Sequence, residues 1–230
     1  MSEDFILAAR HGAAALGSMA TLALLVGLTM VTMGGLRLGA PTGSVATLSM
    51  PSSLSRLFAA PDAPSVYDSE SDMSPTALLD RWSPYIAEAS ARFGLPQAWI
   101  RAVIRRESGG RTVMEDDLPI TSFAGAQGLM QLMPDTYREA RRAFGLGGDA
   151  YDAHDNVMAG AAYLSWLHRR YGFPGMFAAY NDGPGNYEQY LHGGRALPQE
   201  TVAYLAAITA HLKETRGRRI SAARTRRRRA

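Results

Sequence analysis

The sequence predicts a single, mainly α-helical domain in the middle of the chain. Apolar residues recur at the helical i, i+3, i+4, i+7 spacing in several successive segments. Proline, serine or aspartate precedes most of these segments, and glycine follows several of them, as expected at helix starts and ends. No alternating run is long enough to predict a regular strand, although a minor β-hairpin near 111–123 stays open as an alternative.

Two helices are predicted in the first half of this region. Ser83 and Pro84 begin the first, which ends near Gly94. Pro96 begins the second, and Glu107 lies in register with its apolar stripe, at the C-terminal end of that stripe. The stripe consists of Ile100, Val103 and Ile104. This position is unusual for a surface charge and marks Glu107 as a candidate functional residue.

Four further helices are predicted in the second half. Their starts are at Asp135, at Asp155 as an N-cap, at Pro174 and at Pro198. Glycines end the first two, and the third ends at Tyr180. The predicted inner face of the last helix is Val202, Leu205, Ile208, Thr209 and Leu212.

The N-terminal region differs from this helical middle. Residues 13–36 contain no charged side chain, and 24 residues at about 1.5 Å each are long enough to cross a hydrocarbon core of about 30 Å. Residues 1–38 are therefore predicted to form an uncleaved membrane anchor, with a signal segment cleaved after Ala46 as the alternative. Residues 39–75, rich in proline, serine and alanine, predict a disordered linker.

The C-terminal region is strongly basic. Residues 216–230 carry eight arginines and no acid, so the net charge of +3 leaves −5 for the rest of the chain. We expect a solvated, disordered tail with no specific nucleic-acid recognition, and a folded domain over residues 76–215. The chain has no cysteine, which excludes disulfides and a thiol nucleophile. Its five histidines are scattered and no phosphate-binding loop is present, so we expect no metal and no cofactor.

Three short segments follow one another along the chain: residues 107–110 (ESGG), 128–134 (GLMQLMP) and 179–185 (AYNDGPG). Together they resemble the lytic transglycosylase domain of the lysozyme-like superfamily, whose members cleave the glycan strands of bacterial peptidoglycan. The resemblance runs from about residue 83 to residue 211. It implies a lysozyme-like fold, peptidoglycan as the substrate and the bacterial periplasm as the compartment. Residues 13–36 would then anchor a monomer in the inner membrane.

The chemistry of glycosidic cleavage independently favours Glu107. The leaving oxygen needs a proton from a group that is still protonated near neutral pH, whereas a free glutamate has a pKa of about 4.3. Burial in an apolar environment raises this value, to about 6 in lysozyme. The alternative is a salt bridge from Glu107 to Arg105, Arg106 or Arg111.

The sequence offers no second acid within a motif, because Asp116, Asp117, Asp152 and Asp155 are typical turn or cap residues. The resemblance implies a reaction with one acid, in which the muramic 6-hydroxyl attacks the anomeric carbon and leaves a 1,6-anhydro end. The alternatives are a hydrolytic muramidase and a non-catalytic wall-binding subunit of an envelope-spanning complex. Service to a secretion or conjugation apparatus is a further expectation.

The resemblance also implies a set of substrate-binding residues. Gln131 and Met133 would border the reacting sugar, Tyr180 would present its hydroxyl to it, and Ser122 would face the glutamate. Asn181 belongs to the third motif and is expected to hold its turn as well as to contact substrate. Three other features of the sequence are an expected core role for Met130, an enlarged loop at 113–120, and Asp182 in place of the usual alanine.

Overall fold

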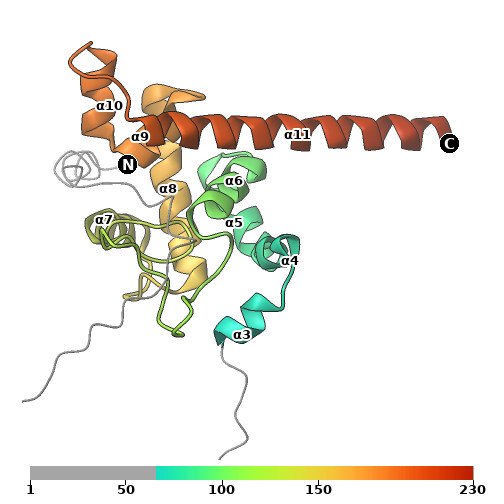
Figure 1. Cartoon of the computed structure of the whole chain (residues 1–230), viewed down its shortest axis with the longest axis horizontal. Helices are drawn as coiled ribbons and strands as arrows, with labels where there is room; N and C mark the ends of the chain where they lie inside the picture. Colours follow the sequence, from blue (N-terminus) through green and yellow to red (C-terminus); the bar gives the residue numbers. More distant parts are fainter. Residues whose placement is uncertain (1–65, 230) are drawn as a thin grey trace, which may run out of the picture.

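The computed structural model describes residues 66–229, and these residues form a mainly helical domain (Figure 1). The predicted fold class is confirmed. The described helices are α3 (Val66–Ser71), α4 (Pro75–Asp80), α5 (Ser83–Phe93), α6 (Gln97–Glu107), α7 (Pro134–Phe144), α8 (Ala153–Tyr171), α9 (Gly175–Asp182), α10 (Pro184–Leu191) and α11 (Gln199–Arg229).

Helix α8 forms the centre of the domain, because α5, α7 and α9 all pack against it. Twelve of its residues are buried, which explains why its sequence is rich in small and apolar side chains. Its N-cap is Asp152, whose side chain accepts a hydrogen bond from the Asp155 backbone N–H at 2.8 Å. The predicted cap at Asp155 was therefore wrong by three residues. Asp155 lies in the first turn, where its negative charge interacts favourably with the helix dipole.

Two glycines let the loop before α7 approach α8 closely. A side chain at Gly160 would come within 2.4 Å of the Met130 sulfur, so glycine makes room for Met130 in the core. Gly128 has a φ of +73°, and a Cβ there would meet the Asn156 side chain at 2.4 Å. Asn156 in turn accepts a hydrogen bond from the Met130 backbone N–H at 2.8 Å. Met130 is fully buried, which confirms its predicted core role.

The segment between α6 and α7 contains short antiparallel pairings but no extended strand. An isolated bridge joins Val113 to Pro119, and the Ile120 N–H donates to the Thr112 carbonyl at 2.9 Å. A second pair of bridges joins Gln127 to positions on either side of it. The expected hairpin near 111–123 is thus reduced to a tight turn, and it fixes the path of the enlarged loop.

The packed domain begins before residue 76, where the sequence analysis placed its boundary. Glu70 in α3 is 1% exposed and forms an ion pair with Arg81. It also accepts hydrogen bonds from the Thr112 backbone N–H at 3.0 Å and from the Thr112 hydroxyl at 2.6 Å. Burial opposes ionisation of Glu70, but these hydrogen bonds outweigh it and hold the pKa of the carboxyl below its usual value.

Helix α11 differs from the prediction in two ways. It continues to Arg229, so residues 216–229 are helical in the structure, and Figure 1 shows this end extending away from the other helices. Its buried face is also rotated relative to the predicted one. Thr201 and Tyr204 are 2% exposed and Ile208 is 3% exposed, whereas Val202 is 47% exposed. The many small apolar residues of this helix gave an ambiguous periodicity, and contact with α6 and α9 decided the phase.

The predicted anchor (residues 1–38) and most of the predicted linker lie outside the described residues. Among residues 66–229, none of the helices has the length and apolar character needed to cross a membrane.

Candidate active site

Glu107 is the last residue of α6, and the only hydrogen bond to its carboxylate from a described residue comes from Tyr204. The Tyr204 hydroxyl donates to Glu107 Oε1 at 2.6 Å, across 97 residues of sequence. Arg106 lies over the Tyr204 ring, 5.7 Å from its centroid. The Glu107 side chain retains partial exposure, so it is packed on most sides yet still reachable.

This environment gives Glu107 the protonation state of a general acid. Burial is the largest influence and raises the pKa of Glu107 to about 7. The negative charge of Glu200 raises it further, while the Tyr204 hydrogen bond and the Arg106 charge oppose the increase. A substantial fraction of Glu107 is therefore protonated at neutral pH. Among residues 66–229, Glu107 forms no salt bridge with Arg105, Arg106 or Arg111, which was the alternative.

Tyr180 lies in α9 beside this acid, and 7% of its surface is exposed. Its hydroxyl donates to the Met130 carbonyl at 2.7 Å. Burial raises the pKa of Tyr180 well above its usual range, and the charge of Glu107 contributes to the increase. The second and third motifs are thus joined through one hydrogen bond next to the carboxyl group of the first. The hydroxyl proton of Tyr180 points to the protein backbone, which leaves its oxygen as a hydrogen-bond acceptor.

Gln131 adopts a strained backbone conformation with a φ of +46°, which residues other than glycine rarely adopt. Its side-chain amide holds the loop in place by donating to the Gly128 carbonyl at 2.8 Å. Met133 is the N-cap residue of α7 and is partly exposed. The strain indicates that the surrounding packing forces this loop into a fixed shape, with Gln131 and Met133 both retaining contact with solvent.

The other predicted site residues have structural contacts. Ser122 closes a turn by accepting a hydrogen bond from the Ala126 N–H at 2.9 Å, and within residues 66–229 no hydrogen bond joins it to Glu107. Asn181 accepts a hydrogen bond from the Thr201 hydroxyl at 2.8 Å and so links α9 to α11. Asp182 is 4% exposed and pairs with Arg195 at 3.2 Å, but burial outweighs this pairing and raises the pKa of Asp182.

Sequence reasoning missed Tyr204 and Glu200, both of which lie in the first two turns of α11. The predicted inner face of this helix included Val202 but neither Tyr204 nor Glu200, so no role was expected for these two residues. The signal that could have found Tyr204 is its spacing from Thr201 and Ile208, which places all three on one face. An aromatic residue with a polar tip on a buried face usually has a hydrogen-bond partner.

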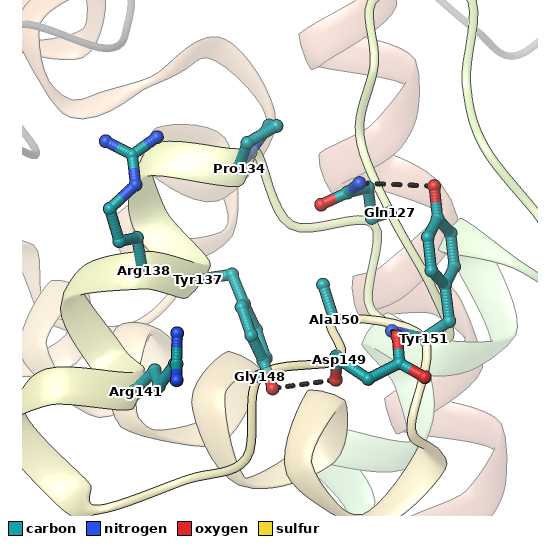
Figure 2. Close-up of a pocket in the computed structure, with 9 residues that line it drawn as sticks. All are labelled: Gln127, Pro134, Tyr137, Arg138, Arg141, Gly148, Asp149, Ala150 and Tyr151. Carbon is teal, nitrogen blue, oxygen red and sulfur yellow. Dashed lines mark hydrogen bonds between the residues drawn. The ribbon is translucent and has the colours of Figure 1, made fainter.

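A cavity of about 300 Å³ is lined in part by Pro134, the last residue of the second motif (Figure 2). Gln127 and Tyr151 form one side and are joined by a hydrogen bond of 3.1 Å, while Arg138 and Arg141 of α7 form the other. Its remaining lining residues are Tyr137, Gly148, Asp149 and Ala150. Neither Glu107, Gln131, Met133 nor Tyr180 lines it, so this cavity is separate from the group of residues around Glu107.

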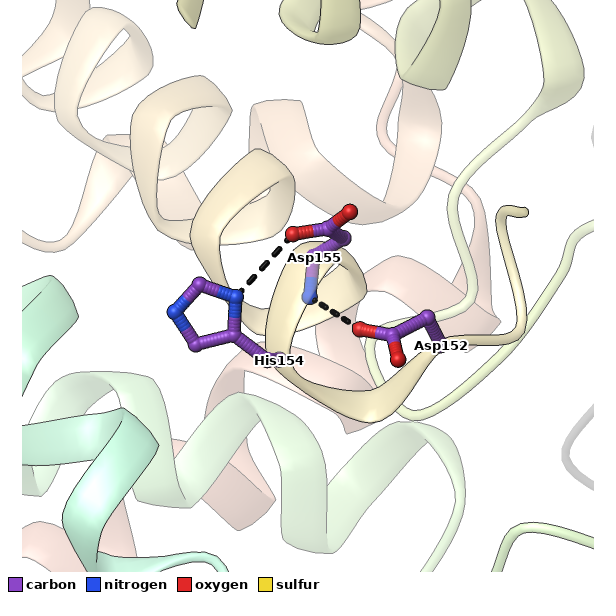
Figure 3. A group of neighbouring side chains, drawn as sticks. All are labelled: Asp152, His154 and Asp155. Carbon is purple, nitrogen blue, oxygen red and sulfur yellow. Dashed lines mark hydrogen bonds and ion pairs between the residues drawn. The ribbon is translucent and has the colours of Figure 1, made fainter. Parts of the chain in front are cut away.

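Asp152, His154 and Asp155 form a group of potential metal ligands at the start of α8 (Figure 3). Each side chain already has a structural partner. Asp152 caps the helix, and Asp155 accepts a hydrogen bond from the Gly147 N–H at 2.6 Å. His154 contacts Asp155 at 3.0 Å and Glu88 at 3.1 Å. We therefore interpret this group as a helix cap that ties α8 to α5.

The fold and the site define a helical domain in which burial raises the pKa of Glu107 to about 7 and a tyrosine of the last helix holds its carboxyl group. The model of the family Transglycosylase SLT domain matches residues 84–202, more than half of the chain, and the chain belongs to this family. The matched residues include all three motifs and Glu107.

Comparisons with individual proteins agree with this family. The soluble lytic murein transglycosylase of Escherichia coli K12 is 30% identical over 159 residues, which cover 66% of this chain and 23% of that protein. The membrane-bound lytic murein transglycosylase C of Histophilus somni 2336 is 30% identical over 132 residues, covering 51% and 35%. The chain thus spans about a quarter to a third of the length of these relatives.

A similar solved structure is the lytic transglycosylase Slt of Pseudomonas aeruginosa. It is 25% identical, with a TM-score of 0.49, over 64% of this chain and 31% of that one.

Proposed function

We propose that this protein is a lytic transglycosylase that cleaves the β-1,4 bond between N-acetylmuramic acid and N-acetylglucosamine in peptidoglycan. One observation carries the proposal: Glu107 is packed on most sides, burial raises its pKa to about 7, and Tyr204 donates a hydrogen bond to it. A carboxylic acid in this state can protonate a glycosidic oxygen at neutral pH. Membership of the transglycosylase family supports the choice of substrate.

The proposed reaction uses Glu107 twice. Its carboxylic acid first gives a proton to the leaving glycosidic oxygen while the bond from that oxygen to the anomeric carbon breaks, and the substrate's N-acetyl group assists. The resulting carboxylate then takes a proton from the muramic 6-hydroxyl, whose oxygen attacks the anomeric carbon. The product is a 1,6-anhydromuramyl end, formed without water.

The neighbouring side chains have separate roles in this proposal. Tyr180 offers its hydroxyl oxygen to the reacting sugar, and the amide oxygen of Gln131 accepts a hydrogen bond from substrate. Met133 covers the acid with apolar surface, which reduces access of water. Ser122 and Asn181 border the sugar through the turns that they hold.

A hydrolytic muramidase is the second candidate function. The observation that favours it is Glu200, because its charge acts on Glu107 and a hydrolase of this kind usually has a second carboxylate. The two candidates differ in their dependence on Glu200. A hydrolase that uses this residue as its base loses activity in Glu200→Gln, whereas the lytic reaction retains most of it.

Mass spectrometry of digested, purified sacculi tests the proposed reaction. Muropeptide ends that are lighter by one water than the hydrolysed product would support it. A digest that contains reducing ends alone would refute it. A Glu107→Gln control establishes the background of anhydro ends already present in the sacculi.

The location and partners of the enzyme are further parts of the proposal. We propose that residues 13–36 hold it at the inner membrane facing the periplasm, and that it opens the wall locally for a secretion or conjugation apparatus. The absence of charge over these 24 residues supports the anchor. Fractionation with N-terminal sequencing tests it: an intact N-terminus in a salt-resistant membrane pellet is expected, and a soluble form beginning near Thr47 would contradict it.

A further inference from the structure

A second cavity, of about 470 Å³, lies between α4, α6 and α11. Four basic side chains and no acidic one contribute to its lining in the described part of the chain. These are Arg101 and Arg105 from α6, and His211 and Arg218 from α11. Its volume falls within the range of small-ligand sites, about 300–1,000 Å³.

The side chains of α6 that line the cavity project away from Glu107. Ala98, Arg101 and Arg105 line the cavity, and successive residues of an α-helix turn by about 100°. Glu107 is therefore about 180° around the helix from Ala98, about 160° from Arg105 and about 120° from Arg101. Glu107 is not among the lining residues, although Gly109, two residues after it, is.

Two of its basic groups face each other directly. The Arg105 guanidinium lies 3.3 Å from His211 Nδ1, so Arg105 donates a hydrogen bond to the neutral imidazole. Burial, together with the charges of Arg105, Arg218 and Arg101, lowers the pKa of His211, while the charge of Glu214 opposes this. Positive potential therefore converges on this point from two helices.

Only part of this charge is neutralised within the fold. Arg101 forms an ion pair with Asp80 and donates to the Leu79 carbonyl at 3.2 Å. Within residues 66–229, neither Arg105 nor Arg218 forms an ion pair with a carboxylate. Both side chains are exposed at the mouth of the cavity, and an anion between them would complete the pairing.

We propose that this cavity is a binding site for a phosphate group, taken either from free phosphate or from the headgroup of an anionic phospholipid. A phosphate has several acceptor oxygens and can accept hydrogen bonds from two or more guanidinium groups at once. A carboxylate has only two oxygens and is less suited to this. The Thr76 hydroxyl provides a further donor at its edge, whereas the Thr215 hydroxyl donates to the His211 carbonyl at 2.9 Å. Pro75, Leu79 and Ala98 add an apolar wall for the carbon atoms next to the phosphate.

Calorimetric titration of the full-length chain at fixed ionic strength tests the proposal. The probes are inorganic phosphate, monomeric dihexanoyl phosphatidylglycerol and, as a lipid without net charge, dihexanoyl phosphatidylcholine. Saturable binding of phosphate or phosphatidylglycerol is expected, with much weaker binding of phosphatidylcholine. Tighter binding of phosphatidylglycerol than of phosphate identifies a lipid headgroup, and the reverse order identifies free phosphate.

Two matched variants separate the cavity from the general charge of α11. Arg218→Gln removes a lining residue and is expected to weaken binding about tenfold. Arg224→Gln removes the same charge from an exposed position further along the helix and is expected to change affinity by less than about twofold, because salt screens charges beyond about 8 Å. Glu107→Gln is expected to bind phosphate as the unmodified chain does, which keeps this test independent of the proposed reaction.

Either of two results would overturn the proposal. The first is an absence of saturable heat with both phosphate and phosphatidylglycerol. The second is an equal loss of affinity in Arg218→Gln and Arg224→Gln, which would show that diffuse charge on α11 accounts for the binding.

Discussion

The Tyr204 hydroxyl donates a hydrogen bond of 2.6 Å to Glu107, and this contact joins the last helix of the domain to the end of α6. Because the hydrogen bond favours the ionised carboxylate, it lowers a pKa that burial would otherwise raise further. Tyr204 therefore orients the acid and also moderates its strength. At a pKa near 7, Glu107 can both give up a proton and take one back, as the proposed reaction requires.

Activity should depend on the protonation of Glu107. Because the acid must carry its proton to donate it, kcat/KM is expected to fall as pH rises through about 7, the pKa of this group in the free enzyme. Initial rates on a soluble glycan fragment between pH 5 and 9 measure this limb. A rate that stays constant across this range would contradict the role of Glu107 as the acid.

Tyr204→Phe should move this limb to higher pH. The substitution removes the hydrogen bond that favours the carboxylate, so the pKa of Glu107 rises. Tyr190→Phe, at an exposed tyrosine of α10, is the matched control and should leave the profile unchanged. A uniform loss of rate at every pH, without a shift of the limb, would show that Tyr204 acts only on the fold.

Glu107→Gln should lower the rate of cell-wall clearance by at least about 10²-fold, because the amide cannot deliver the proton. Turbidity of a purified sacculus suspension measures the loss, and circular dichroism checks that the variant is folded. Glu115→Gln, at an exposed loop position, is the control. Substantial clearance by a folded Glu107→Gln protein would rule out this assignment.

The same substitution should change how stability depends on pH. The pKa of Glu107 is raised to about 7 in the folded state from a usual value of 4.5, so the folded state binds the proton more tightly. Ionising Glu107 therefore costs stability as pH rises from about 4.5 to 7. Relative to the unmodified protein, Glu107→Gln should gain stability over this interval, by at most about 3 kcal/mol. Urea unfolding at pH 4.5 and 7.5 gives the two differences.

Tyr180→Phe should cost about 1–3 kcal/mol of unfolding free energy, because it leaves the Met130 carbonyl buried without its hydrogen bond. The rate should fall as well if the hydroxyl oxygen also contacts substrate. Tyr85→Phe, at a half-buried tyrosine of α5 whose ring packs against Trp82 and His154, is the comparison for loss of a hydroxyl alone. Unchanged stability in Tyr180→Phe would mean that the contact with Met130 contributes little.

Glu70→Gln should destabilise the domain at neutral pH by about 1–3 kcal/mol, because Arg81 loses the carboxylate with which it pairs. The loss stays within this range because Arg81 is partly exposed and water can solvate it. The pKa of Glu70 is lowered in the folded state, so its contribution is present above the unfolded pKa near 4.5 and is lost as pH falls through the folded value. The difference between the two proteins should therefore shrink in acid. Thermal unfolding at pH 7 and pH 3 measures it, and an equal difference at both values would contradict the ion pair.

The sequence by itself determined six of the nine described helices (α5 to α9 and the first part of α11) and the order of the three motifs, and it was enough to propose Glu107 as the acid. These features depend on local patterns, since helix periodicity, prolines and glycines act over a few residues. The apolar stripe of α6 was sufficient to turn Glu107 inward. By contrast, only the structure showed that Gly160 makes room for Met130.

The tertiary structure decided which side chains meet Glu107 and how strong an acid it is. Tyr204 lies 97 residues away, and its position depends on the phase in which α11 packs against α6 and α9. A helix with small apolar residues on several faces permits more than one phase, and only the burial of particular side chains selects one. The pKa of Glu107 has the same origin, because desolvation and the charge of Glu200 arise when distant segments are brought together.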